Sequence, residues 1–329
     1  MILAGDTGGT KTVLAIFETK GEQLSVVREA TYPCADYPSL EAILAVFLAG
    51  DKIALAGACF GVAGPIAGHT AKITNLPWTI DATVLREQLG GVPVQLVNDL
   101  QATALGTLIL PARAFAVLQP QVTPAPQGTI AVIAPGTGLG EAMLVHDGQR
   151  YVALPSEGGH ADFAPGTDEE IELLRFLRRR HGNHVSYERV LSGAGLGDLY
   201  SFVRERTGTP EPAWLTAEIA AGDRNAVVSK SGLAKTDEAA VRALEMFAEM
   251  LGAEAGNLAL RGFATSGVVI GGGISPKLLP ALQTGSLLAR FTDKGRYSAW
   301  TRTLGVRVTL EPRAALYGAA HLVATSPRS

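Results

Sequence analysis

Two segments share one pattern that restricts the folds open to this chain: an apolar run, a turn of glycine and threonine, and a second apolar run. The first is LAGDTGGTKTVLAIFE, at 3–18, and the second is TIAVIAPGTGLGEAMLV, at 129–145. Apolar runs rich in β-branched residues predict a strand, a tight turn and another strand in both. Gly8 superposes on Gly138 at an offset of 138 − 8 = 130. We therefore expect an internal duplication that gives two similar α/β halves.

Neither turn matches the two familiar phosphate loops. A Walker loop ends in Gly-Lys-Ser/Thr, which is absent, and a dinucleotide fingerprint needs a helix after its glycines, whereas TVLAIFE predicts a strand. Glu141 also occupies the position of the fingerprint's third glycine in PGTGLGE. The remaining possibility is a hairpin turn whose N–H groups and threonine hydroxyls cradle phosphate, with Asp6 placed to hold Mg²⁺ through water.

The alternative is a glycine hairpin with an ordinary turn aspartate. For one copy that interpretation is the stronger, but two copies in a common register favour phosphate binding. A third glycine turn, Gly271–Gly273, follows the apolar run GVVI and adds to the same preference.

A second group of polar residues follows the segment VPVQLVNDL, which predicts a buried strand ending at Asn98 and Asp99, with a helix after it. The carboxyl ends of strands are where α/β folds place ligands. Asp99 is therefore a candidate general base, and a helix N-cap is the alternative. Asn98 adds a donor and an acceptor that could orient a hydroxyl group.

Two further segments carry candidate ligands. In PSEGGHADFAP, Glu157 and His160 flank two glycines, which would let the backbone approach a ligand; a polar surface loop is the alternative. Glu188, in HVSYERVLSG, is a third candidate, or an exposed helix carboxylate. The histidine pair in HGNH, at 181–184, predicts a surface loop and no metal site, because no cysteine is nearby.

The organisation along the chain is that of two lobes. Asp168–Arg180 predicts a helix, with acids in its first turn, bases in its last and Gly182 after it. A longer helix should span TDEAAVRALEMFAEMLGAEAGNLALRG. The Pro-rich segment 118–128 is the best linker candidate.

Composition excludes several classes of protein. A net charge of −3 over 329 residues gives no positive field for nucleic acid. Cys34 and Cys59 are too few for a disulfide framework, which fits a reducing compartment. Asp6 and Lys11 interrupt any apolar signal region, and no uncharged stretch reaches the roughly 18–20 residues of a membrane span. We expect a cytoplasmic protein with no membrane and no nucleic-acid partner.

Taken together, the motifs resemble the bacterial glucokinase family, within the fold shared by actin, heat-shock chaperone ATPases and sugar kinases. The resemblance covers about residues 2–320. GDTGGTK and APGTGLG resemble the family's two phosphate motifs, and GGGI resembles its adenosine motif. The segments that resemble its sugar site are TNLPW, VNDL, PSEGGHADFAP and ERVLSG. The cysteine-rich zinc signature of the related repressor and kinase family is missing after His160. The resemblance therefore favours the non-zinc type.

The resemblance implies a two-lobed actin-like (ribonuclease H-like) ATPase fold with duplicated mixed-sheet domains. The small α/β domain would comprise 1–110, rejoined by 303–329, and the large one 111–302, with the active site in the cleft between them. It also implies a homodimer.

Carried over by position, the resemblance makes Asp99 the catalytic base. Sugar ligands fall on Asn75, Asn98, Asp99, Glu157, His160 and Glu188. Nucleotide contacts fall on Asp6, Thr7, Gly8, Gly9, Thr10 and Lys11, on Gly136, Thr137 and Gly138, and on Gly271, Gly272 and Gly273, with Asp6 near the metal. One departure is Pro135, where relatives often have a smaller residue; proline removes a backbone donor on that side of the phosphate.

The activity implied is transfer of the γ-phosphate of ATP, with Mg²⁺ as cofactor, to the 6-hydroxyl of glucose. A non-catalytic sugar sensor of the same fold is the alternative. A nucleotide-dependent dehydrogenase is disfavoured by the missing fingerprint. The sequence leaves open whether ATP, ADP or polyphosphate is the donor.

Overall fold

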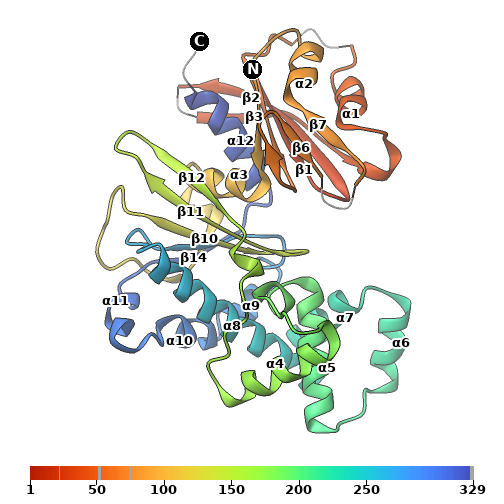
Figure 1. The fold of residues 1–329 in the computed structure, drawn as a ribbon, viewed down its shortest axis with the longest axis vertical. Helices are drawn as coiled ribbons and strands as arrows, with labels where there is room; N and C mark the ends of the chain where they lie inside the picture. The colour runs from red at the N-terminus through yellow and green to blue at the C-terminus, as the bar shows by residue number, and fades with distance from the viewer. Residues whose placement is uncertain (22, 51–52, 74–75, 327–329) are drawn as a thin grey trace. The chain divides into compact units, whose positions relative to one another are not determined.

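The computed structural model describes residues 1–21, 23–50, 53–73 and 76–326 (Figure 1). The chain divides into two compact units. The first comprises Met1–Ala114, Gln149–Pro155 and Glu311–Ser329, and the second comprises Phe115–Gly148 and Ser156–Leu310. No helix among the described residues is both long and apolar enough to cross a membrane.

The first unit contains a five-stranded mixed sheet in the order β3-β2-β1-β4-β8. The strands are β1 (Ile2–Thr7), β2 (Lys11–Lys20), β3 (Gln23–Pro33), β4 (Gly57–Val62) and β8 (Val94–Asn98). β1, β2 and β3 are antiparallel neighbours, whereas β4 runs parallel to β1 and to β8. The carboxyl ends of β1, β4 and β8 therefore meet at one edge of the sheet. A small sheet is formed by β5 (Ile66–Ala67), β6 (Thr70–Lys72) and β7 (Thr79–Asp81).

The second sheet has the order β12-β11-β10-β13-β14-β9. Its strands are β9 (Phe115–Gln119), β10 (Ile130–Pro135), β11 (Leu139–His146), β12 (Tyr151–Ser156), β13 (Val268–Ile270) and β14 (Val306–Thr309). β10 and β11 form an antiparallel hairpin, and β13 runs parallel to β10 and to β14. Without β9, this order repeats that of the first sheet strand for strand, so the predicted duplication is present in the fold.

The register of the duplication differs from the predicted one. β1 begins at Ile2 and β10 at Ile130, an offset of 130 − 2 = 128, and the second strands begin at Lys11 and Leu139, again 139 − 11 = 128. Gly8 thus corresponds to Gly136 and not to Gly138. Both turns carry two glycines, so the glycines alone are compatible with an offset of 128 or of 130. The ends of the strands show that the offset is 128.

Helices cover both sheets. The first unit has α1 (Leu40–Phe47), α2 (Ala82–Gln88), α3 (Asp99–Gly106) and α12 (Ala314–Thr325). The second has α4 (Asp168–His181), α5 (Gly193–Thr207), α6 (Ala213–Ala221), α7 (Arg224–Leu233), α8 (Glu238–Arg261), α9 (Leu279–Leu282), α10 (Ser286–Thr292) and α11 (Ser298–Thr301). Short 3₁₀ turns include η3 (Gly158–His160) and η4 (Tyr187–Arg189).

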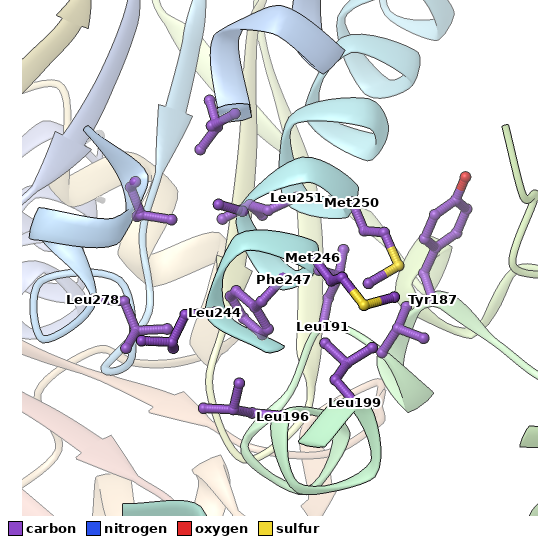
Figure 2. Packing of buried hydrophobic residues seen from close by; sticks show 14 of the residues in the cluster. Tyr187, Leu191, Leu196, Leu199, Leu244, Met246, Phe247, Met250, Leu251 and Leu278 are labelled. Carbon is purple, nitrogen blue, oxygen red and sulfur yellow. The ribbon is translucent and has the colours of Figure 1, made fainter. Parts of the chain in front are cut away.

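The core of each unit explains its helix packing. In the first unit α3 and α12 approach so closely that a Cβ on Gly106 would lie 1.9 Å from the Ala314 carbonyl oxygen, which requires glycine. In the second unit α8 is buried along most of its length, and Figure 2 shows Leu244, Phe247 and Leu251 of this helix inside the apolar cluster.

Several predictions of local structure hold and three need correction. The strand–turn–strand units, α4 with its C-cap Gly182, and the long helix α8 are as predicted. β8 is an edge strand and mostly half-buried, because no strand covers its outer side. The Pro-rich segment 118–128 lies inside the second unit, where β9 pairs with β14. β14 belongs to that unit as well, whereas Glu311–Ser329, the larger part of the segment 303–329 expected to rejoin the small domain, lies in the first unit.

Candidate active site

The carboxyl edge of the first sheet brings the predicted acidic residues together. Thr7 pairs with Val62 across β1 and β4, and Val62 pairs with Asn98 across β4 and β8. Asp6 and Asp99 therefore lie near the same edge, one on each side of β4. Gly61 of β4 has no side chain to separate them, and a Cβ there would lie 3.6 Å from the Asp99 Cα. The sequence predicted both residues but not their proximity.

The electrostatics of this edge are unusual for a turn aspartate. The pKa of Asp6 is raised to about 6, chiefly by burial and secondly by the negative charge of Asp99, while Lys11 opposes the shift. Two carboxylates that share one environment disfavour each other's ionised form. Because perturbed carboxylates cluster at functional sites, this pair is a candidate for chemistry rather than for turn formation alone.

The question of whether Asp99 is the N-cap of α3 is answered by its neighbour. The Asn98 side chain accepts hydrogen bonds from the backbone N–H groups of Leu100 (3.0 Å) and Gln101 (3.4 Å), and Gln101 completes a capping box. Asp99 is the first residue of the helix, and its Oδ1 accepts from the Leu100 N–H at 2.8 Å. Asn98 is thus the cap, and its Oδ1 is occupied in that role.

The first glycine turn is closed by its own backbone and held by a cysteine. Gly8 N–H donates to the Lys11 carbonyl at 3.1 Å, and Cys34 N–H donates to the Thr10 carbonyl at 2.9 Å. The Cys34 thiol lies 3.5 Å from both the Gly8 carbonyl and the Thr12 hydroxyl. The Thr10 side chain is exposed, as a phosphate ligand would need to be.

The second glycine turn is held by other partners. Gly136 N–H donates to the Gly138 carbonyl at 2.7 Å, and Gly193 N–H donates to the Gly136 carbonyl at 3.0 Å. The carboxylate of Glu188 accepts from Leu139 N–H at 3.0 Å, directly beside Gly138. The structure thus brings Glu188 to this turn, which its place in the sequence did not predict.

The glycine triplet lies against the second turn. Gly271 N–H donates to the Ile133 carbonyl at 2.7 Å, and Gly272 has φ +80°. A Cβ on Gly272 would lie 2.2 Å from the Pro135 carbonyl oxygen, whereas Gly273 has nothing within 4 Å and is exposed. Pro135, the departure from the family pattern, thus ends β10 and contacts the triplet through its carbonyl group.

The segment 157–160, here called the sugar segment, is more exposed. The Glu157 and His160 side chains are 84% and 59% exposed, and Nε2 of His160 lies 4.0 Å from a carboxylate oxygen of Glu157. His184, from the HGNH loop, lies 3.1 Å from the His160 carbonyl oxygen and 3.0 Å from an Asp162 carboxylate oxygen. Asn75, the remaining candidate sugar ligand, lies outside the described residues.

Sequence patterns missed three residues that support these segments: Cys34 beside the first turn, His184 beneath the sugar segment, and Glu141 next to Gly158. For Cys34 and His184 the only signal was the presence of a polar residue in a loop. For Glu141 it was a carboxylate in an apolar run, an uncommon feature in a buried strand.

A magnesium ion is implied at this site, and the residues fit one. No group of three or more histidine, cysteine or acidic side chains suited to a metal occurs in the described part of the chain. Asp6, however, offers carboxylate oxygens, which are hard donors. The negative charge of Asp99 disfavours the ionised form of Asp6, and the positive charge of Lys11 favours it. A bound cation would favour the ionised form further. One carboxylate with several waters is the usual manner of holding Mg²⁺ next to phosphate.

Comparison with known proteins places the chain in a family. The glucokinase family model matches residues 3–326. The chain belongs to the glucokinase family. It is 40% identical to a glucokinase of Nostoc punctiforme over 97% of this chain and 98% of that protein.

Solved structures agree with this assignment. A glucokinase from an Antarctic psychrotroph matches with a TM-score of 0.87 and 31% identity over 99% of both chains. A ROK family glucokinase of Streptomyces griseus, solved with glucose and AMPPNP, matches with a TM-score of 0.63 and 20% identity over 99% of both chains. The latter shows the shared two-domain α/β kinase fold alone.

Proposed function

We propose that this protein is an ATP-dependent glucokinase, which transfers the γ-phosphoryl group of ATP to the 6-hydroxyl of glucose. The observation that carries the proposal is the pairing of Asp99 with Asp6 at the carboxyl edge of the first sheet, in a chain of the glucokinase family. Phosphoryl transfer depends mainly on positioning and on charge stabilisation, and two glycine turns supply the backbone donors for it.

Asp99 acts as the general base. As the sugar oxygen attacks phosphorus, the O6–H proton passes to the Asp99 carboxylate, the O6–P bond forms, and the bond from phosphorus to the bridging oxygen of ADP breaks. Asn98 caps α3 through its Oδ1, so its amide nitrogen remains to orient a hydroxyl group.

The glycine turns hold the nucleotide phosphates. The Gly8 and Gly136 N–H groups close the turns themselves, so the proposed phosphate donors are the other N–H and hydroxyl groups of Asp6–Lys11 and Gly136–Gly138. The open space at Gly273 would receive the adenosine. Asp6 holds Mg²⁺ through water, and the bound ion would neutralise charge on the phosphate oxygens. The buried hydroxyl of Thr7, which has no hydrogen-bond partner among the described residues, is one of the proposed nucleotide contacts.

Sugar recognition rests on Asn75, Asn98, Glu157, His160 and Glu188. One Glu188 oxygen accepts from Leu139 N–H, and we propose that the other accepts from a sugar hydroxyl. A set of fixed polar groups rejects sugars without the matching hydroxyls, because the unmatched groups would be left unpaired. Glucose should therefore react and fructose should not.

A coupled assay for glucose 6-phosphate tests the proposal, with purified protein, ATP, Mg²⁺ and glucose, and with fructose and mannose in parallel. Product from glucose supports it, and parallel assays with ADP and polyphosphate identify the donor. Absence of product from every sugar, with glucose still bound in calorimetry, would contradict the proposal and leave a sugar sensor.

We further propose a homodimer and a cytoplasmic location; sedimentation equilibrium tests the former and cell fractionation the latter.

A further inference from the structure

The first residues of β11 form a support for the sugar segment. A Cβ on Gly159 would lie 2.1 Å from the Leu139 carbonyl oxygen, and a Cβ on Gly158 would lie 2.1 Å from Oε2 of Glu141. Both glycines therefore rest directly on β11, where no side chain could intervene. Any movement of the Glu141 carboxyl group would act on the backbone that carries Glu157 and His160.

The Glu141 carboxyl group is in an unfavourable environment for a charge. The residue is fully buried, and neither oxygen has a hydrogen bond of normal geometry within the described residues. Glu254 of α8, also fully buried, lies next to it. Glu254 already has partners, because it accepts a hydrogen bond from Asn257 at 3.0 Å and forms an ion pair with Arg261.

The groups that face Glu141 come from three elements. α8 contributes Glu254 and Arg261, and η4 contributes Tyr187, which is linked to the pair through Asn257 at 3.2 Å. Figure 2 shows Tyr187 at the edge of the apolar cluster, with its hydroxyl directed away from the leucines. On the other side lies the sugar segment, whose Glu157 and His160 are exposed to solvent. Among these groups, Arg261 is the one cation that acts on Glu141 and Glu254, and it forms its ion pair with Glu254.

Burial and the charge of Glu254 raise the pKa of Glu141 to about 8, against an opposing effect of Arg261. The carboxyl group is therefore neutral in the physiological range. Above pH 8 it would acquire a charge beside a second buried carboxylate, and an uncompensated buried charge is costly enough to displace its surroundings.

We infer that Glu141 is a positioning residue: its neutral carboxyl group seats the sugar segment on β11, and its ionisation unseats Gly158 and weakens glucose binding. This inference rests on the proposed function, because it assumes that Glu157 and His160 bind the sugar.

The size of the effect follows from linkage. If the unseated segment exposes Glu141 to water, the pKa of its carboxyl group is ordinary there, whereas in the seated segment it is about 8. The ratio of seated to unseated segment then falls by up to about tenfold for each pH unit below 8 and becomes constant above 8. The KM for glucose should thus rise as the pH approaches 8 and level off above it. The KM for ATP and kcat at saturating glucose should change much less, because neither depends on the sugar segment alone.

The experiment is a set of KM and kcat profiles for glucose between pH 6.5 and 9.5. Wild type should show a KM that rises up to about pH 8 and then levels off, and Glu141→Gln, which keeps the shape but cannot ionise, should show a flat KM. Glu254→Gln removes the neighbouring charge, lowers the pKa of Glu141 in the seated segment, and should move the levelling-off to lower pH. The exposed Glu238→Gln, on the same helix as Glu254, is the matched control and should behave as wild type.

Each outcome bears on a different claim. Identical KM profiles for wild type and Glu141→Gln would overturn the inference and leave the kinase activity standing. No phosphorylation of glucose by wild type at pH 7 would overturn the proposed function instead. If Glu141→Gln fails to fold, as judged by thermal melting, the Glu254→Gln profile decides alone: a KM that levels off at the same pH as in wild type would contradict the role of Glu141.

Discussion

The two glycine turns close hairpins in sheets with the same strand order, yet their surroundings differ in kind. The first turn has two carboxylates, Asp6 and Asp99, at its sheet edge and a thiol against its backbone. The second has no acidic residue at the equivalent of Asp6: counting 6 + 128 = 134 gives Ala134. Its partners are Glu188 and the glycine triplet.

This difference shows what the duplication kept and what it changed. Both copies keep a backbone that offers N–H groups at the end of a parallel strand, the feature that phosphate binding needs. The side chains around it differ: the first copy carries the paired carboxylates Asp6 and Asp99, for which we propose metal binding and proton transfer. The second carries small residues and one carboxylate that fixes the turn.

The largest effect should come from removing the base of the first copy. Asp99→Asn keeps the shape but cannot accept the proton, so kcat should fall by roughly 10²- to 10⁴-fold while glucose affinity changes little. Steady-state kinetics with calorimetry for glucose measure both. Near-normal turnover of Asp99→Asn would show that Asp99 is not the general base.

A pH effect on stability should distinguish the second copy. The pKa of Glu141 is raised from 4.5 to about 8. The folded state therefore holds its proton longer than the unfolded state, and this group's contribution to stability is lost as pH rises from 4.5 towards 8. Relative to wild type, Glu141→Gln should gain on the order of 4–5 kcal/mol across this interval, at about 1.4 kcal/mol for each unit of the pKa difference. Urea unfolding at pH 5 and pH 8 measures the gain, and a constant difference would contradict the shift.

One glycine substitution in each turn compares the two turns, although Gly138 and Gly8 do not occupy equivalent positions. A Cβ on Gly138 would lie 2.3 Å from the Glu188 carboxylate, whereas one on Gly8 would lie 3.6 Å from its nearest neighbour. Gly138→Ala should displace Glu188 from Leu139 N–H and destabilise the protein by about 1–3 kcal/mol, the cost of an unpaired buried donor. Gly8→Ala should change stability by less than about 0.5 kcal/mol. Equal melting temperatures would mean that Glu188 does not hold the second turn.

The smallest effect concerns the thiol of the first turn. Cys34→Ala removes a weak donor to the Gly8 carbonyl, so the KM for ATP should rise about fivefold, equivalent to about 1 kcal/mol. Cys34→Ser restores a donor and should recover most of the affinity. If alanine and serine behave alike, the thiol only fills space.

The strands around both turns could be predicted, because apolar runs rich in β-branched residues on either side of a glycine turn are typical of two strands joined by a hairpin. Asp99 could be predicted as a candidate general base because it follows a strand. That it is not the N-cap of α3 could not be predicted, because this depends on the capping box that Asn98 and Gln101 form three residues apart. The link between Glu141 and Gly158 could not be predicted, because it depends on how a loop lies over a strand. The alignment of the copies was misplaced for a related reason: strand ends, and not glycines, set it.

The most direct test of the account is a single-turnover reaction with [γ-³²P]ATP, Mg²⁺, glucose and protein in excess over the nucleotide. The account predicts that the label appears in glucose 6-phosphate with the wild type and that its transfer is slowed at least about a hundredfold by Asp99→Asn. Label that remains in ATP, or is released only as inorganic phosphate, would contradict it.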